Sequence, residues 1–263
     1  MKSKAENHYY RLPVLDGLEL LDARRHRQDF PFHTHDTFNI TLIREQRFTT
    51  RLSNRVLETT KGSILITHPQ EVHATLCDNE AGSSFFTFYV SPDVLHSLNG
   101  QQPVYFDNGV IEDAALFAAF DSIAGRAQHL QMANQLLAIL KQLLQRRASL
   151  PAVHPEQARL FQRFIQEEPV EKFSLEQVAG RFGLDKFKFL RLFKQQTGLT
   201  PNNYIILRRV EKAKALLRQQ ADLLAVAVQS GFYDATHLCR HFKRITGVTP
   251  MAYRQAVMCN IVP

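Results

Sequence analysis

The feature that most constrains this chain is an internal repeat in roughly its last hundred residues. One set of residues recurs in the same order, first as Val178-Ala179, Gly183, Arg191, Phe193-Lys194, Thr197-Gly198, Thr200-Pro201 and Tyr204, and then as Val226-Ala227, Gly231, Arg240, Phe242-Lys243, Thr246-Gly247, Thr249-Pro250 and Tyr253. The offset is 48 residues up to the glycine and 49 after it, so the second copy has one extra residue in its turn or at the start of the next helix. This part of the chain must therefore fold as two similar units.

Each copy has the pattern of a helix, a tight turn and a second helix. Gly183 and Gly231 suit the turns, because a residue without Cβ lets two helices meet at a steep angle. Ser174, Asp185 and Asp234 are good N-caps, and a glycine followed by Thr-Pro ends each second helix. We expect helix-turn-helix motifs at 175–197 and 223–246. The segment from residue 201 to about 219 predicts a joining helix roughly 25 Å long.

The second helix of each copy has an apolar face and a basic face. A helix of this kind can lie in the major groove of DNA, with its ends on phosphates and its middle on base edges. Residues 158–254 hold 17 Lys and Arg against 8 Asp and Glu, whereas the whole chain has a net charge of +7. All of the excess positive charge is thus in the repeat region. A solvated cationic surface on a purely structural repeat is the alternative, but two copies of the same basic face favour binding to double-stranded DNA.

The repeat region, from Leu160 to Arg254, resembles the AraC/XylS family of bacterial transcription regulators. The residues that carry the resemblance are Val226-Ala227, Gly231-Phe232, Asp234, Phe242-Lys243, Gly247 to Pro250 and Tyr253-Arg254, together with Arg209, Ala213, Leu216 and Leu217 in the joining segment. Three residues depart from the family pattern: Asp185 stands where Ser is common, Leu190 where a polar residue is common, and Leu238 where an aromatic residue is common.

The resemblance and the outward basic face together give the expected DNA contacts. They are Lys186, Phe187, Lys188, Leu190, Arg191, Lys194, Ala235, Thr236, His237, Arg240 and Lys243. Leu190 suits a thymine methyl group better than a hydrogen bond to a base. The resemblance implies a sequence-specific DNA-binding transcription regulator, with activation as the expected mode and RNA polymerase as a possible further partner.

The first half of the chain has the pattern of a β-barrel followed by helices. From Leu18 to about Val94, short alternating or apolar runs are separated by turn signals about every ten residues. Helical spacing replaces this pattern after about Ile111. We expect a sensory and dimerisation domain over residues 1–150, a proline-containing linker over 151–155, and an all-α DNA-binding domain over 156–263, with its two helix-turn-helix motifs joined by a long helix.

A leucine stripe marks the segment from Gln131 to Arg147. Its members Leu136, Leu140, Leu143 and Leu144 lie on one face of the expected helix. The stripe could pack on its own barrel or on the same helix of a second subunit. We predict the second arrangement, which makes the protein a homodimer.

Three histidines single out one end of the expected barrel. The segment Phe32-His33-Thr34-His35-Asp36, with Gly62, Pro69 and His73, resembles a cupin-type sensory domain (a cupin-like jelly roll), although the Glu of metal-binding cupins is missing. We expect a small-molecule effector beside His33, His35, His73, Phe38, Phe86 and Phe88, with no metal and no cofactor. A three-histidine zinc or iron site is the alternative.

Other classes of function have less support. A metal-dependent cupin enzyme fused to a DNA-binding domain and a constitutive regulator with a structural first domain are the alternatives. The sequence has no Gly-rich phosphate loop and no nucleophile motif, so we expect no enzymatic activity. It also lacks a run of 18 apolar residues and a signal peptide, and its three cysteines form no CxxC pair. We therefore expect a cytoplasmic protein with free thiols.

Overall fold

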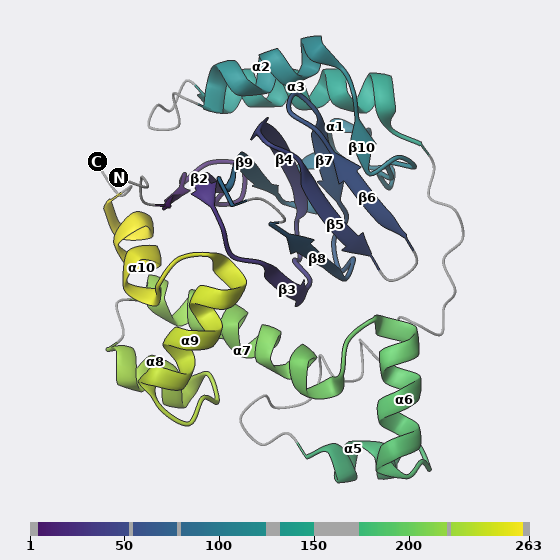
Figure 1. The fold of residues 1–263 in the computed structure, drawn as a ribbon, viewed down its shortest axis with the longest axis vertical. Coiled ribbons are helices and arrows are strands. Elements are labelled where there is room, and N and C mark those ends of the chain that lie inside the picture. The colour runs from purple at the N-terminus through teal and green to yellow at the C-terminus, as the bar shows by residue number, and fades with distance from the viewer. Residues whose placement is uncertain are drawn as a thin grey trace. The chain divides into compact units, whose positions relative to one another are not determined.

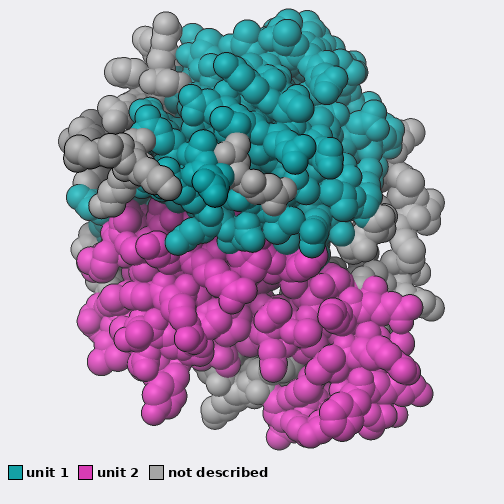
Figure 2. All heavy atoms as spheres, in the orientation of Figure 1, with its two compact units in different colours: residues 1–29, 34–153, 255–263 teal, residues 30–33, 154–254 magenta. Residues whose placement is uncertain are grey.

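The computed structural model describes residues 5–52, 55–77, 80–124, 132–149, 174–219 and 222–259. The predicted linker, residues 151–155, lies outside this part of the chain. The chain divides into two compact units, coloured separately in Figure 2. One comprises residues 1–29, 34–153 and 255–263, and the other residues 30–33 and 154–254. The short segment 30–33 groups with the second unit in this division, although it forms a strand of a sheet in the first.

The first half of the chain is a sandwich of two sheets. Its strands are β1 (Glu6–Arg11), β2 (Glu19–His26), β3 (Phe30–His33), β4 (Phe38–Glu45), β5 (Phe48–Leu52), β6 (Val56–Thr59), β7 (Ile64–Thr67), β8 (His73–Leu76), β9 (Ser83–Val90) and β10 (Val110–Ile111). One sheet has the strand order β1-β2-β9-β4-β7-β10 and the other β3-β8-β5-β6. The prediction of a β-barrel of the jelly-roll type followed by helices is confirmed. The prediction began at Leu18 and therefore missed β1, a polar strand at the edge of the larger sheet.

Helices cover the outer face of the larger sheet (Figure 1). They are α1 (Pro92–Leu98), α2 (Ala114–Ala124) and α3 (Met132–Arg147). Phe88 of β9 packs on Phe120 of α2 with ring centroids 5.5 Å apart. The even-numbered residues of β4 and β9 point toward these helices, so the main hydrophobic core lies between the sheet and the helices.

The leucine stripe of α3 belongs to this core. Leu136, Leu140 and Leu143 are fully buried, and Leu144 is nearly so. They pack with α2 and the sheet of the same chain. The prediction that these four leucines contact a second subunit is therefore wrong, because side chains already covered by their own subunit have no surface left to offer. The sequence showed an apolar stripe but not which surface covers it.

The second half of the described chain is all helical. Its helices are α5 (Leu175–Arg181), α6 (Lys186–Thr197), α7 (Pro201–Arg218), α8 (Leu223–Gln229), α9 (Ala235–Thr246) and α10 (Pro250–Cys259). The long helix α7 joins the two helix pairs (Figure 1). Its buried residues include Tyr204, which packs edge-on against Phe193 of α6. Tyr253 packs in the same way against Phe242 of α9, so the repeat in sequence is a repeat in packing. None of the described helices is long and apolar enough to cross a membrane.

Candidate nucleic-acid interface and histidine cluster

Hydrogen bonds at both ends fix where α6 and α9 begin and end. The Asp185 carboxylate accepts from the backbone N–H groups of Phe187 and Lys188, at 2.9 and 3.0 Å. These N–H groups, that of Lys188 first, lower the pKa of Asp185. Asp234 accepts from the N–H of His237 at 2.6 Å. Each helix ends at a glycine with φ of 78°, a conformation that favours glycine.

The two helix pairs have helices of equal length and differ in the length of their turns. Helices α6 and α9 have 12 residues each, and α5 and α8 have 7 each. The segment between the paired helices is residues 182–185 in the first copy and 230–234 in the second. The extra residue of the second copy is therefore in the turn. After it, even small details repeat: Thr197 donates to the carbonyl of Phe193 and Thr246 to that of Phe242, at 2.7 and 2.8 Å.

Helices α6 and α9 present the same kind of face to solvent. Their inner faces are fixed by Phe189, Phe193, Leu238 and Phe242, all with no exposed area. Of the predicted contact residues, those exposed are Lys186, Phe187, Lys188, Arg191, Lys194, Thr236, Arg240 and Lys243, and those partly buried are Leu190, Ala235 and His237. Arg244, which was not among the predicted contacts, is also exposed on this face. No predicted contact residue is buried.

Most of the cations on this face form no ion pair with the residues that the structure describes. Lys186 forms an ion pair with Glu176, 3.3 Å from Nζ to Oε1. Six other cations, Lys188, Arg191, Lys194, Arg240, Lys243 and Arg244, have no ion pair within the described part of the chain. Burial, followed by the neighbouring His237, lowers the pKa of His241 to about 4, so His241 adds no charge at neutral pH. Such a face can bind a polyanion.

Phe187 adds an apolar side chain to this basic face. It lies at the start of α6 and is 74% exposed. The Lys186 ammonium is 5.3 Å from the centre of its ring. A large exposed aromatic ring among cations suits contact with sugars or thymine methyl groups of DNA.

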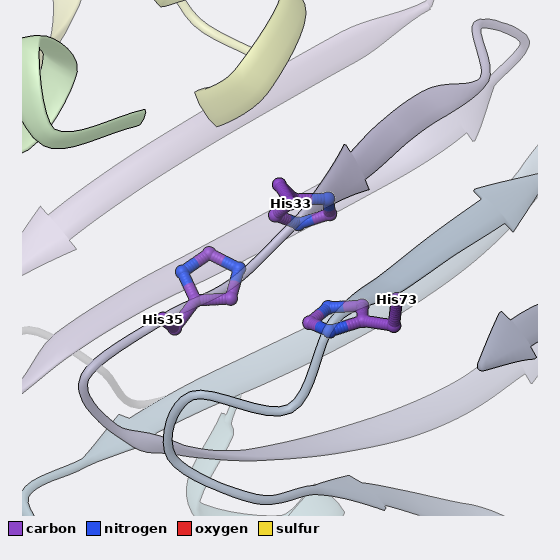
Figure 3. Close-up of side chains that lie close together, drawn as sticks. All are labelled: His33, His35 and His73. Atoms are coloured by element: carbon purple, nitrogen blue, oxygen red, sulfur yellow. The ribbon is translucent and has the colours of Figure 1, made fainter. Parts of the chain in front are cut away.

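The three predicted histidines come together at the smaller sheet. His33 ends β3, His35 follows two residues later, and His73 begins β8, which neighbours β3 in the sheet. Each ring offers one nitrogen, and the three nitrogens all lie within 4.8 Å of one another. The rings face a common point in Figure 3. Because β3 and β8 are paired strands, the fold itself creates this cluster.

Burial and hydrogen bonds define the state of two of these rings. His33 and His73 are buried, whereas His35 is partly exposed. The Nδ1 atom of His33 lies 2.6 Å from the carbonyl oxygen of Pro31, and that of His73 lies 2.9 Å from the carbonyl oxygen of Glu71. A carbonyl only accepts, so each Nδ1 must carry the hydrogen. Burial also lowers the pKa of His73, so this ring is uncharged at neutral pH.

The aromatic residues predicted for the effector pocket do not lie beside these histidines. Phe38, Phe86 and Phe88 are buried in the core formed with the helices. Tyr89, whose side chain points to the other face of β9, packs on His35 with ring centroids 5.3 Å apart. The run from Phe85 to Val90 is apolar on both faces, so its sequence did not show which residues face the histidines.

The inner face of the larger sheet is polar near the cluster. Asn39 and Thr67 pair with each other across β4 and β7, and Asn39 also pairs with Tyr89 across β4 and β9. Thr41 and Thr87 share a hydrogen bond of 3.0 Å. The buried hydroxyl of Thr67 has no hydrogen-bond partner in the described structure. Alternating polar residues in β4, residues 39 and 41, were the sequence signal for this face.

A separate pocket of about 570 Å³ opens beside β1, β2, β4 and α2. Its lining is charged, with Arg44 at its centre. Arg44 donates to Asp121 at 2.7 Å and to Asp22 at 3.3 Å, and its guanidinium lies over the Phe86 ring. Because Arg44 is already paired with Asp121 and Asp22, it is less available to bind an effector. The inner polar face is therefore the better candidate for the effector site.

Comparisons with known proteins agree for both halves of the chain. Residues 17–162 match a family described as an AraC-like ligand binding domain, and residues 178–256 match a helix-turn-helix domain. The transcriptional regulator YbfI of Bacillus subtilis, itself uncharacterized, is 27% identical over 80% of this chain and 82% of its own length. The transcriptional activator RhaS of Shigella flexneri is 25% identical over 92% of this chain and 94% of its own.

A solved structure shares the fold. The apo form of a ToxT variant from Vibrio cholerae aligns with a TM-score of 0.58 over 97% of this chain and 98% of its own, at 12% identity. The two family matches cover the sandwich from β2 onward and the tandem helix-turn-helix motifs from Val178 onward. The chain belongs to the AraC family of DNA-binding transcription regulators that carry a ligand-binding N-terminal domain.

Proposed function

We propose that this regulator reads its DNA site with α6 and α9, placed in two stretches of major groove. The observation that carries the proposal is the repeated outward face, whose six cations lack ion pairs in the described chain. Helix α7 has 18 residues, which gives a rod of about 27 Å. A helix of this length suits two recognition helices held on one face of a duplex, about one turn of 34 Å apart.

A footprint on DNA tests this assignment. The full-length protein is first used to select its site from randomised duplexes. Hydroxyl-radical cleavage should then show two protected stretches about 10 base pairs apart. Arg191→Ala should relax base preference in one stretch only, and Arg240→Ala in the other, with Arg51→Ala, an exposed arginine of β5, as the control. A single protected stretch, or one stretch affected by both substitutions, would contradict the proposal.

The N-terminal domain is proposed to hold a small polar organic effector. The support is the inner face that carries Asn39, Thr41, Thr67 and Thr87, with Tyr89 and the histidines beside it. A face of hydroxyls and amides inside an apolar shell suits a ligand with several polar groups. ToxT, which has the same fold, has been solved with (E)-4-(8-methylnaphthalen-1-yl)but-3-enoic acid bound.

A thermal-shift screen of sugars, polyols and small carboxylic acids against the full chain tests the effector proposal. A true effector should raise the melting temperature of the wild type and of His8→Ala, an exposed histidine on β1, and should do so less for Tyr89→Phe and His35→Ala. A compound that stabilises all four proteins equally binds elsewhere and would count against this site.

We further propose that the protein activates transcription, that it contacts RNA polymerase, and that it associates with a second copy of itself. RhaS is a transcriptional activator. We expect purified protein and RNA polymerase to raise transcription from the selected site in vitro. Because the leucine face of α3 is covered, a dimer would have to use another surface, such as the outward face of that helix, which carries Gln135, Ala138 and Lys141. Sedimentation of the full chain with and without DNA measures the stoichiometry directly.

A further inference from the structure

The histidine cluster has the arrangement of ligands around a metal ion. His33 and His73 come from neighbouring strands, and His35 lies two residues from His33. Their ring nitrogens converge to within 4.8 Å of one another (Figure 3). In a tetrahedral zinc site with Zn–N bonds of about 2.0–2.1 Å, the nitrogens are about 3.3 Å apart. Small side-chain rotations, which move each nitrogen by about 1 Å, would close the difference.

Two of the three rings are held in the tautomer that can bind a metal ion through Nε2. The Nδ1 atoms of His33 and His73 donate to the carbonyl groups of Pro31 and Glu71, so the lone pair of each ring is on Nε2. A metal-bound histidine typically makes this kind of bond with its other nitrogen, which fixes the ring and its tautomer. The carbonyl groups of Pro31, within β3, and Glu71, just before β8, thus orient two imidazoles in the metal-free protein.

The lone pairs of the cluster are suited to a cation. Two rings whose Nε2 atoms are both acceptors repel each other when they face a common point. A cation between the three rings is attracted to all three lone pairs at once.

The composition of the cluster selects the kind of ion. No carboxylate joins the three imidazoles among the residues that the structure describes. Ca²⁺ and Mg²⁺ prefer oxygen ligands, whereas neutral imidazole suits Zn²⁺ and neighbouring transition metals. Three protein ligands leave a fourth position of a tetrahedral ion for water or for an oxygen atom of an effector.

We propose that His33, His35 and His73 bind one Zn²⁺ ion, which ties β3, the segment after it and β8 together. The site rests on the geometry of these three side chains, so it holds whether or not an organic effector binds beside them. The metal-free expectation followed from the missing Glu and from the reading of the histidines as part of an effector pocket, whereas the convergence of the three ring nitrogens favours a metal ion.

Direct zinc binding tests the proposal on the full-length protein without an affinity tag. Competition with a chromophoric chelator should give one Zn²⁺ per chain. His35→Ala and His73→Gln should each weaken zinc binding by about a hundredfold or more, beyond the usual effect of losing a hydrogen-bond partner of a ligand. The matched control His8→Ala should bind as the wild type does. Equal zinc affinity in all four proteins would overturn the proposal.

A second measurement avoids the substitutions, in case a buried histidine is needed for folding. X-ray absorption fine structure of the zinc-loaded wild type counts imidazole ligands, and Co²⁺ in place of zinc should show the intense visible bands of a four-coordinate ion. Three imidazoles support the site, and one or none overturns it. Repeating the effector screen after chelation distinguishes the two proposals. Effector binding that survives metal removal supports the effector proposal, whereas the number of zinc ions bound per chain tests the zinc proposal independently.

Discussion

The salt dependence of DNA binding follows from the charges on α6 and α9. Each phosphate that a Lys or Arg neutralises releases condensed counterions, so the logarithm of the binding constant falls with the logarithm of salt concentration with a slope of about −0.9 per contact. The six cations without ion pairs in the described chain set the expected number of contacts. Arg191 and Arg240 are assigned to base edges, so the other four are expected to reach phosphates; the slope is then about −3.6, and affinity falls about 150-fold between 50 and 200 mM salt.

Single substitutions separate the two kinds of contact within that total. Lys194→Ala should reduce the magnitude of the slope by about 1 and weaken all sequences alike, as expected for a phosphate contact. Arg191→Ala and Arg240→Ala should each cost about 1–3 kcal/mol on the selected site and relax its base preference, as expected for middle-of-helix contacts to base edges. Fluorescence anisotropy of labelled duplexes at four or more salt concentrations measures both quantities.

Two results would refute this reasoning. A slope shallower than about −2 would mean that the repeated basic face is not the main DNA surface. The same conclusion would follow if Arg51→Ala, which removes an exposed charge from β5, changed the slope as much as Lys194→Ala does.

Three further experiments, with five substitutions, test the fold. Phe193 and Phe242 have no exposed area, so changing either to Ala should lower the free energy of unfolding by about 3–5 kcal/mol in denaturant titrations. Phe187 is 74% exposed, so Phe187→Ala should change this free energy by less than about 0.5 kcal/mol and should weaken DNA binding instead. Equal losses of stability at the buried and exposed positions would contradict the packing. Leu140→Asp should unfold the N-terminal domain, seen as loss of its thermal transition, and recovery of a folded monomer would show that this leucine served a dimer after all. Burial lowers the pKa of His26, so the unfolded chain takes up a proton more readily; stability should be full above about pH 6.5 and fall as the pH drops below it, and His26→Gln should flatten this dependence in thermal melts.

Local signals made the helical half predictable. Asp185, Asp234 and the glycines that end α6 and α9 act within one turn of their own position, so their roles can be read from neighbouring residues. The same holds for the outward cations, because helical periodicity assigns the face.

Contacts between distant segments were harder to predict. The pairing of β3 with β8, which brings His73 to His33, depends on the whole order of strands in the sheet. The leucine stripe of α3 was recognised, but its covering surface is built from residues far away in sequence. For the same reason, an aromatic run with apolar residues at every position, as in β9, does not reveal its two faces.

Strand β9 places two different selective constraints on alternate residues. Phe86 and Phe88 fill a close-packed core with the helices, so a change of volume at either position costs stability. Residues 87 and 89 face the opposite side, where chemistry rather than volume matters. If the proposed effector binds at this face, substitutions at the odd-numbered positions of β9 can change the ligand while the even-numbered residues preserve the fold.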